Sequence, residues 1–552
     1  MTGSLTSLSG DLTDEPGDGG RFDAIVIGAG LCGLYQVYRL REQGYSVQCF
    51  EEGAGVGGTW FWNRYPGCAF DSPSEEYGYS FSEDILQEWN WTHYYSYQPD
   101  AERYLNFVAD KLRLRKHIRF NSRVVAATWV EDECFWEVEL GNGERACASF
   151  LIASVGGLTA APYTPRFEGM ARFRGEQHHI GRWPADGIDF TGKRVAVIGS
   201  GPSAIQLIPE VAKQCAHLTV FQRTANYAFP ADNDVVEPQV QLEWKANYPA
   251  LHQKIRTYYL GIQHEQDTRS GADVPREERL RKYEEAWKLR GYAKHMTLFW
   301  DLTVNREINA EYSDWLREKI RQRVDDPTVA EKLVPTHPFG AKPAMLESGY
   351  YETFNRENVL LVDVKEAPIK SLTEEGIETG DQAYEFDVIL YGTGYDARTG
   401  PLTRIDVRGV DGGALSERWD EHGPVSYLGL MVAGFPNFFF GSPSALCSTY
   451  TICAEWSGDW IVACLDHMRA NGHIRIEPTQ EAEDAWVKKH DEVGSTTLFN
   501  EVDSNWLAGT NIPGRKWRRL VSYAKTGPLW YADVLERGYD GFIFGKAREK
   551  VA

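Results

Sequence analysis

The residues best suited to chemistry begin with three glycines that follow a short apolar run. Residues 22–27 are typical of a buried strand, and Gly28, Gly30 and Gly33 follow at the spacing G-x-G-x-x-G, ahead of an amphipathic helix. A second strand closes with Glu51, about 20 residues further on. The first glycine permits a tight turn, the second lets main-chain N–H groups approach a pyrophosphate, and the third lets helix and strand pack closely. An acid at this position binds ribose hydroxyls, so the segment predicts a dinucleotide site.

A second segment repeats the pattern further along the chain. A buried strand leads into Gly199 and Gly201, with Ser203 at the start of a helix, and the next strand ends at Arg223 and Thr224. A base in place of the acid can hold the 2′-phosphate of a phosphorylated ribose. The first site therefore favours FAD and the second favours NADPH. The alternative for Arg223 is a solvated surface side chain.

A longer pattern lies between the two glycine segments. Phe173, Gly175, His179, Trp183 and Pro184 fill every fixed position of F-x-G-x-x-x-H-x-x-x-W-P. With this motif the chain resembles the type I Baeyer–Villiger monooxygenases. The resemblance extends over nearly the whole chain, through segments 57–71, 98–99, 221–224, 392–395 and 506–514.

The same patterns indicate the architecture. We expect an α/β fold with two Rossmann-like dinucleotide-binding domains, one for FAD and one for NADPH, and a helical insertion where charged helix formers replace strand formers. The expected organisation is a disordered leader at residues 1–20, an FAD-binding domain at 21–157 and 396–552, an NADPH-binding domain at 158–232 and 343–395, and a helical subdomain at 233–342.

The resemblance implies an enzyme that uses FAD, NADPH and O₂. In the family's cycle nicotinamide reduces the flavin, oxygen adds to it, and a peroxyflavin attacks the carbonyl of a small-molecule ketone to give an ester or lactone. This chemistry needs a dry pocket that shields the reactive flavin from proton transfer. Aromatic side chains suit the wall of such a pocket, although most of them belong to the core in a chain this rich in tryptophan. The candidates are Trp60, Trp62, Tyr77, Tyr79 and Trp506.

The resemblance also implies site residues. Asp71 stands where the family keeps an acid beside an active-site cation, and His179 and Trp183 act at a distance through the linker motif. The alternative for His179 is a core histidine bonded to the backbone. The catalytic candidates are Asp71, Arg64, Lys342, His179, Trp183 and Trp506. The cofactor-binding candidates are Gly28, Gly30, Gly33, Glu51, Gly58, Thr59, Trp60, Tyr77, Gln98, Gly199, Gly201, Ser203 and, toward the 2′-phosphate, Arg223, Thr224 and Lys342.

One position departs from the family's pattern. Where the family reads Pro-Phe-Gly-x-Lys-Arg, residues 338–343 read Pro-Phe-Gly-Ala-Lys-Pro. The family's arginine stabilises negative charge during the reaction, whereas Pro343 offers neither a charge nor an N–H. Three interpretations stay open. The preferred one is Baeyer–Villiger oxidation supported by Lys342 or Arg64. The second is that the enzyme oxygenates nitrogen or sulfur, or hydroxylates, through a hydroperoxyflavin. The third is that the protein is an NADPH oxidase or redox sensor.

Composition narrows the classes of partner. The 552 residues are 42% apolar, enough for several cores, and carry a formal charge of −21, which argues against nucleic-acid and anionic-membrane partners. No apolar run reaches the roughly 20 residues of a membrane-spanning helix, so we expect a cytoplasmic protein of open oligomeric state. The nine cysteines show no C-x-x-C pair and no metal-ligand spacing, so we expect neither a metal site nor a disulfide framework.

Overall fold

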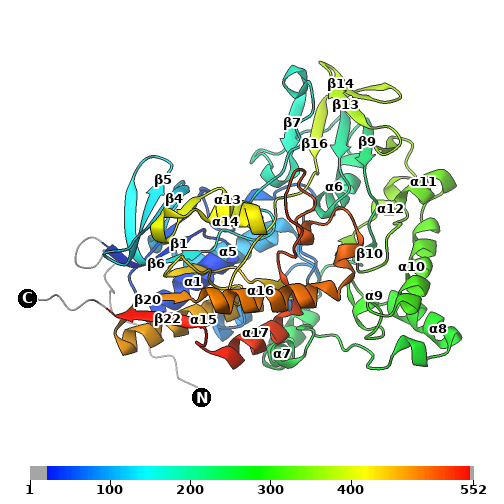
Figure 1. The fold of residues 1–552 in the computed structure, drawn as a ribbon. Coiled ribbons are helices and arrows are strands. Elements are labelled where there is room, and N and C mark those ends of the chain that lie inside the picture. Colours follow the sequence, from blue (N-terminus) through cyan, green and yellow to red (C-terminus); the bar gives the residue numbers. More distant parts are fainter. Residues whose placement is uncertain (1–20, 547–552) are drawn as a thin grey trace, which may run out of the picture.

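The structure is a computed structural model that describes residues 21–546, so the expected leader at residues 1–20 lies outside the described part. Two sheets dominate it, one to the left and one at the upper right of Figure 1, with a group of helices at the right edge. Strands in both sheets alternate with helices along the chain. This arrangement agrees with the predicted α/β class.

The first sheet is built from both halves of the chain. Its strand order is β17-β4-β5-β6-β1-β2-β3, and β18 also pairs with β6. Residues 24–27 of β1 are apolar and buried, as expected for a strand covered on both faces. The strands are β1 (Arg21–Ile27), β2 (Val47–Phe50), β3 (Ile118–Arg119), β4 (Val124–Val130), β5 (Phe135–Leu140), β6 (Arg145–Ala153), β17 (Asp406–Arg408) and β18 (Phe438–Phe440).

Two helices support this sheet from residues far apart in the sequence. Helix α1 (Leu31–Glu42) starts directly after Gly30 and packs against α15 (Tyr450–Asn471). Tyr35 Oη and Arg39 Nε of α1 both donate to Asp459 Oδ1 of α15, at 2.6 and 2.9 Å. The other helices of this part are α2 (Thr59–Trp62), α3 (Ser74–Tyr77), α4 (Glu83–Glu88), α5 (Gln98–Lys111), α13 (Thr399–Thr403), α14 (Leu415–His422), α16 (Gln480–Ser495) and α17 (Gly527–Arg537).

The second sheet is parallel throughout. Its strands, in spatial order, are β12 (Val359–Asp363), β9 (His217–Gln222), β8 (Arg194–Ile198), β16 (Val388–Tyr391) and β7 (Glu176–His179). Each neighbouring pair is parallel. Helix α6 (Pro202–Ala212) follows β8, and α12 (Tyr350–Thr353) packs beside α6. A smaller antiparallel sheet sits at the top of Figure 1 and contains β13 (Ile369–Leu372), β14 (Gly376–Thr379) and β15 (Ala383–Glu385).

Helices fill the stretch between β9 and β12, as the charged sequence predicts. They are α7 (Pro238–Thr257), α8 (Arg276–Trp287), α9 (Ala293–Met296), α10 (Arg306–Arg321) and α11 (Pro327–Leu333). In α10 the buried residues Ile308, Tyr312, Leu316 and Ile320 recur every fourth position, which places them on one helix face. The chain enters and leaves this stretch through β10 (Ala228–Pro230) and β11 (Met345–Glu347), which pair in parallel. The exact domain boundaries stay a prediction.

Two further strand pairs and one disulfide complete the fold. Strand β20 (His473–Pro478) pairs with β22 (Phe542–Lys546), and β19 (Ala445–Leu446) pairs with β21 (Tyr523–Thr526). Cys447 and Cys453 form a disulfide between the loop after β19 and the first turn of α15. Cysteine spacing did not predict this one pair, because spacing along the chain does not report which thiols the fold brings together.

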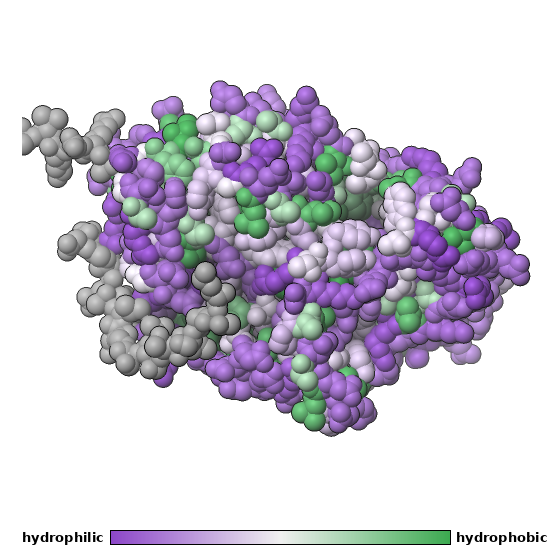
Figure 2. Space-filling model, turned by 90° about the horizontal axis from the view of Figure 1, so that it is seen from below, coloured by the Kyte–Doolittle hydropathy of each residue, from purple (hydrophilic) through white to green (hydrophobic). Residues whose placement is uncertain are grey.

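Figure 2 shows a hydrophilic face on which apolar side chains form small separate patches. Within residues 21–546 no helix is long and apolar enough to cross a membrane, and no group of His, Cys, Asp and Glu is arranged to hold a metal ion.

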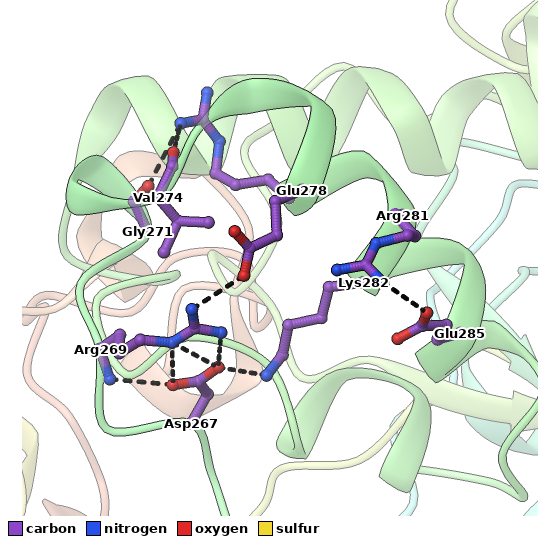
Figure 3. A network of polar contacts seen from close by, with 9 residues as sticks. Asp267, Arg269, Gly271, Val274, Glu278, Arg281, Lys282 and Glu285 are labelled. Atoms are coloured by element: carbon purple, nitrogen blue, oxygen red, sulfur yellow. Dashed lines mark hydrogen bonds and ion pairs between the residues drawn. The ribbon is translucent and has the colours of Figure 1, made fainter.

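An ion network fixes the loop between α7 and α8 (Figure 3). Asp267 accepts hydrogen bonds from Arg269 Nη2 at 2.8 Å and from Lys282 Nζ, and Arg269 Nη1 also donates to Glu278 at 2.9 Å. The Arg269 guanidinium, helped by Lys282, holds the pKa of Asp267 well below its usual range. The carboxyl therefore favours the folded state above its ordinary pKa, and this contribution is lost as the pH falls through the lower folded-state value.

We predict that Asp267→Asn lowers the free energy of unfolding at pH 7 by about 1–3 kcal/mol, because charge-assisted hydrogen bonds are lost from a largely buried group. Glu285→Gln is the matched control, since it removes only the exposed Arg281–Glu285 pair at 3.7 Å. That pair should contribute at most about 0.5 kcal/mol. Urea-induced unfolding measures both variants, and equal losses would contradict the role given to Asp267.

Candidate functional site

A large cavity lies at the carboxyl ends of the parallel strands of both sheets. Its volume is about 1770 Å³. A pocket for one drug-sized ligand is typically about 300–1,000 Å³, so this cavity has room for more than one ligand. The predicted residues that line it are Gly28, Gly30, Glu51, Gly58, Thr59, Trp60, Trp62, Asp71, Tyr77, His179, Gly199, Gly201, Ser203, Arg223, Thr224, Lys342 and Trp506.

The first glycine segment is shaped by close main-chain contacts. Gly28 has a φ of +97°, and a Cβ on Gly33 would lie 1.8 Å from the Gly28 carbonyl oxygen. Only glycine fits at position 33, so α1 can begin right beside β1. Gly30 precedes α1 with no side-chain cap, which leaves the N–H groups of the first turn free to bind an anion.

Glu51 stands at the end of β2, where its carboxylate organises the neighbouring loops. Its Oε2 accepts from the Ala29 N–H and its Oε1 from the Gly53 N–H, both at 2.7 Å. Burial raises the pKa of Glu51, and the two N–H groups oppose that shift. The carboxyl group also lines the cavity, in the position predicted for a ribose contact.

The second glycine segment leaves open space in front of a helix. Gly199 has a φ of +116°, and a Cβ there would lie 2.3 Å from the Gly392 carbonyl oxygen. A Cβ on Gly201 would meet no atom within 4 Å, although Gly201 directly precedes α6. The helix start therefore faces a space large enough for a phosphate.

Two cations face this space without a carboxylate partner. Arg223, exposed at the rim, donates from Nη2 to Ser504 Oγ at 2.8 Å, and Lys342 lines the same cavity. Neither forms an ion pair within the described residues. Burial, together with the positive charges of Arg223 and Lys365, lowers the pKa of Lys342 to about 8. An anion placed here would relieve the repulsion between the cations.

Asp71 is bonded to an uncharged partner. Its Oδ2 accepts from the Tyr292 hydroxyl at 2.9 Å and from the Leu346 N–H at 3.5 Å. Burial raises the pKa of Asp71 to about 6, and the two hydrogen bonds partly oppose that shift. The sequence did not predict Tyr292, because no motif surrounds it and only the fold of the helical stretch brings it to Asp71.

His179, at the end of β7, bonds to the backbone that follows the neighbouring strand β16 of the same sheet. The Gly181 N–H donates to His179 Nδ1 at 3.0 Å, so Nε2 carries the proton and donates to the Gly394 carbonyl at 3.2 Å. Burial lowers the pKa of His179 to about 4, so the ring is neutral at pH 7. The geometry matches the alternative of a histidine bonded to the backbone, and it also matches a linker that acts at a distance.

Several predicted residues do not line the cavity. Arg64 Nη2 pairs with Glu102 at 2.7 Å and stacks over Phe61, so its charge is directed away from the cavity. Gln98 Nε2 donates to the Trp60 carbonyl at 2.6 Å and holds α2 in place. Trp183 packs against Tyr65 and Phe190, and Gly33 lies behind Gly28. Tyr79 is buried in the core.

The rest of the cavity wall combines aromatic rings with buried polar atoms that have no hydrogen-bond partner within the described part of the chain. Trp60 Nε1 donates to Tyr77 Oη at 2.7 Å, and the ring of Tyr77 stacks on Phe70 with centroids 4.0 Å apart. The side-chain oxygens of Ser154 and Ser522 are buried beside the cavity without a hydrogen-bond partner. Buried polar groups normally find a partner, so a polar ligand such as a flavin fits this wall.

Comparisons with known proteins agree with this geometry. Residues 23–239 match the model of the flavin-binding monooxygenase-like family. The chain is 42% identical to a 2-oxo-Δ³-4,5,5-trimethylcyclopentenylacetyl-CoA monooxygenase of Pseudomonas putida, over 94% of this chain and 98% of the relative. It is 36% identical to a phenazine N-monooxygenase of Lysobacter antibioticus, over 95% of this chain and 97% of the relative.

A solved structure shows the same fold. The crystal structure of OTEMO in complex with FAD and NADP superposes with a TM-score of 0.89 at 41% identity, over 95% of this chain and 99% of that one. The chain belongs to the Baeyer–Villiger monooxygenase family. The family predicted from the sequence and the predicted α/β fold class are thereby confirmed. The roles of individual site residues stay predictions.

The two glycine segments of this Baeyer–Villiger family member should respond differently to alanine. Gly33→Ala forces a methyl group onto the Gly28 carbonyl and should lower the melting temperature, because main-chain atoms must move. Gly201→Ala meets no protein atom and should leave the melting temperature of the ligand-free protein unchanged. Differential scanning fluorimetry measures both variants. A stable Gly33→Ala variant would contradict the close packing of α1 on β1.

Proposed function

We propose that this protein is a monooxygenase that uses FAD, NADPH and O₂ to convert a ketone into an ester or lactone. The observation that carries this proposal is the single cavity that joins an acid-ended dinucleotide site to a base-ended one. The relatives support it, because a similar monooxygenase is named for a cyclic enone substrate and a similar structure holds FAD and NADP.

The two dinucleotides would occupy different ends of the cavity. FAD would be held by Gly28, Gly30 and Glu51, with its pyrophosphate at the start of α1. NADPH would be held by the start of α6, with its 2′-phosphate between Arg223 and Lys342. When bound, NADPH supplies a hydride to the flavin, and the reduced flavin supplies the electrons that activate O₂.

The chain's own residues orient these groups and exclude water. His179 holds the end of β7 to the start of the 392–395 crossing, which leads from the second sheet back to the first. Trp60, Phe70 and Tyr77 form a packed aromatic wall that limits solvent access. Asp71 places a carboxyl group at the cavity with no cation in contact with it among the described residues.

Pro343 favours a second candidate activity, the oxygenation of nitrogen or sulfur. Pro343 lines the cavity where the family keeps an arginine, and Arg64 is turned toward Glu102 and does not replace it. A soft nucleophile needs less stabilisation of negative charge than a ketone does. The relative named as a phenazine N-monooxygenase supports this candidate.

We expect the purified protein, loaded with FAD and supplied with NADPH and ¹⁸O₂, to insert one labelled oxygen atom into a cyclic ketone. Mass spectrometry detects the labelled lactone, and a panel that also contains thioethers and aromatic N-heterocycles decides between the two candidates. Labelled sulfoxide or N-oxide without lactone would select heteroatom oxygenation. Stoichiometric hydrogen peroxide with no labelled product would overturn both and indicate an NADPH oxidase.

Arg223→Ala should raise the KM for NADPH by about 10- to 100-fold, because one charge-assisted hydrogen bond to the 2′-phosphate contributes about 1.5–3 kcal/mol. The KM for NADH, which lacks that phosphate, should stay unchanged. Arg174→Ala is the matched control, since it removes an exposed arginine that pairs with Glu374 in the same part of the fold. An equal rise in both KM values would contradict the assignment of the 2′-phosphate to Arg223.

A further inference from the structure

The hydroxyl of Tyr292 lies between two oxygens, each of which accepts a hydrogen bond. It is 2.9 Å from Asp71 Oδ2 and 2.9 Å from the Ala344 carbonyl oxygen. A phenol carries one hydrogen, and a carbonyl carries none. A full two-centre hydrogen bond at both contacts therefore requires that Asp71 supply a second proton.

The hydrogen-bonded group formed by Tyr292, Asp71 and the Ala344 carbonyl lies next to Pro343, where the family has an arginine. Ala344 directly follows Pro343, and Tyr292, Asp71, Pro343 and Ala344 all line the cavity. A carboxylate at Asp71 would be an unpaired negative charge in a cavity that has to accept negative charge during oxygenation. A protonated Asp71 removes that conflict.

We propose that Tyr292 is a positioning residue that couples the protonation of Asp71 to the Ala344 carbonyl: it donates to that carbonyl when the Asp71 carboxyl is protonated, and to Asp71 when it is a carboxylate. This inference rests on the proposed function for its catalytic meaning. The proton arrangement itself does not depend on turnover.

Two states follow from the geometry. In the protonated state Asp71 donates to Tyr292 Oη, and Tyr292 donates to the Ala344 carbonyl. When Asp71 loses its proton to solvent, Tyr292 turns its hydrogen to the carboxylate, and the Ala344 carbonyl loses this donor. The charge on Asp71 is thus coupled to the hydrogen bond that holds the segment after Pro343.

The groups around Asp71 carry no charge near neutral pH. Burial raises the pKa of Cys68 to about 12 and raises those of Tyr95 and Tyr292 above their ordinary value, so all three stay protonated. The ring of His295 lies edge-on to Tyr292 with centroids 5.3 Å apart, and burial lowers the pKa of His295 to about 3. With the pKa of Asp71 raised by burial to about 6, Asp71 is the group of this cluster that titrates near neutral pH.

Glu76 is the second acid whose titration has to be separated from that of Asp71. It lines the same cavity and accepts from Thr449 Oγ1 at 3.0 Å and from the Gln263 N–H at 3.2 Å. Burial raises the pKa of Glu76 to about 7. Glu76→Gln therefore removes a transition close to the one expected for Asp71.

The test is an infrared titration of the flavin-loaded full chain, with no NADPH present. The protonated-carboxyl band that disappears in Asp71→Asn belongs to Asp71, and we expect its midpoint near pH 6. Tyr292→Phe removes a donor that stabilises the carboxylate, so it should raise that midpoint by about 1 pH unit or more. Glu76→Gln should leave the Asp71 transition in place.

Tyr312→Phe is the matched control for loss of a buried hydroxyl. Tyr312 lies in α10, and its hydroxyl has no hydrogen-bond partner among the described residues. This variant should leave the Asp71 midpoint unchanged. An Asp71 midpoint at the ordinary value of about 4 would overturn the inference. So would a midpoint that is unchanged in a folded Tyr292→Phe variant, and the wild-type titration decides alone if that variant does not fold.

Turnover adds a second readout, which separates this inference from the proposed function. The fraction of NADPH that yields oxygenated product should fall as the pH rises through the Asp71 midpoint, and it should be independent of pH in that range in Asp71→Asn. If no substrate is oxygenated but the titration behaves as expected, the proposed function fails and the proton-sharing group stands. If oxygenation occurs and the midpoint is ordinary, only the inference fails.

Discussion

The cavity depends on how the segments that follow two neighbouring strands of the second sheet, β7 and β16, are held side by side. His179 ends β7 and Gly181 follows it, whereas Gly394 and Tyr395 lie on the crossing that leads from β16 back to the first sheet. His179 bonds to the Gly394 carbonyl at 3.2 Å, and Tyr395 Oη bonds to Asn63 Oδ1 at 2.8 Å. A Cβ on Gly181 would lie 2.4 Å from Tyr395 Oη, so glycine is needed for this approach. These contacts place the carboxyl ends of both sheets around one cavity, where parallel α/β sheets bind ligands.

Charge is distributed unevenly around that cavity. At one end Arg223 and Lys342 face open space, and no acid among the described residues pairs with them; the lowered pKa of Lys342 reflects burial and the repulsion between these cations. Near Pro343 the charge is of the opposite sign: Asp71 is bonded to the neutral Tyr292, and no cation within residues 21–546 pairs with it. A phosphate would satisfy the first region, and a proton satisfies the second. The same rule of charge compensation therefore explains both ends of the site.

The sequence predicted the parts of the site that depend on local spacing. The glycines, Glu51 and Arg223 each follow a strand at a fixed offset, so the βαβ unit brings them to the cavity wherever that unit folds. The direction of a long side chain is not local, which is why Arg64 was a candidate cation and yet pairs with Glu102. Tyr292 and the Cys447–Cys453 disulfide were missed for the same reason, since contacts far along the chain or within an irregular loop leave no periodic pattern.

The central claim is that the protonation of Asp71 sets the charge beside position 343, where Pro343 supplies no cation to balance a carboxylate. The most direct test restores the cation with Pro343→Arg and measures product formed per NADPH between pH 5.5 and 8, a range chosen around the Asp71 pKa of about 6. A guanidinium beside Asp71 should lower the pKa of that carboxyl, so the fall in coupling expected for the wild-type protein in this range should disappear. A pH profile identical to that of the wild-type protein, in a folded variant that binds FAD, would contradict the claim.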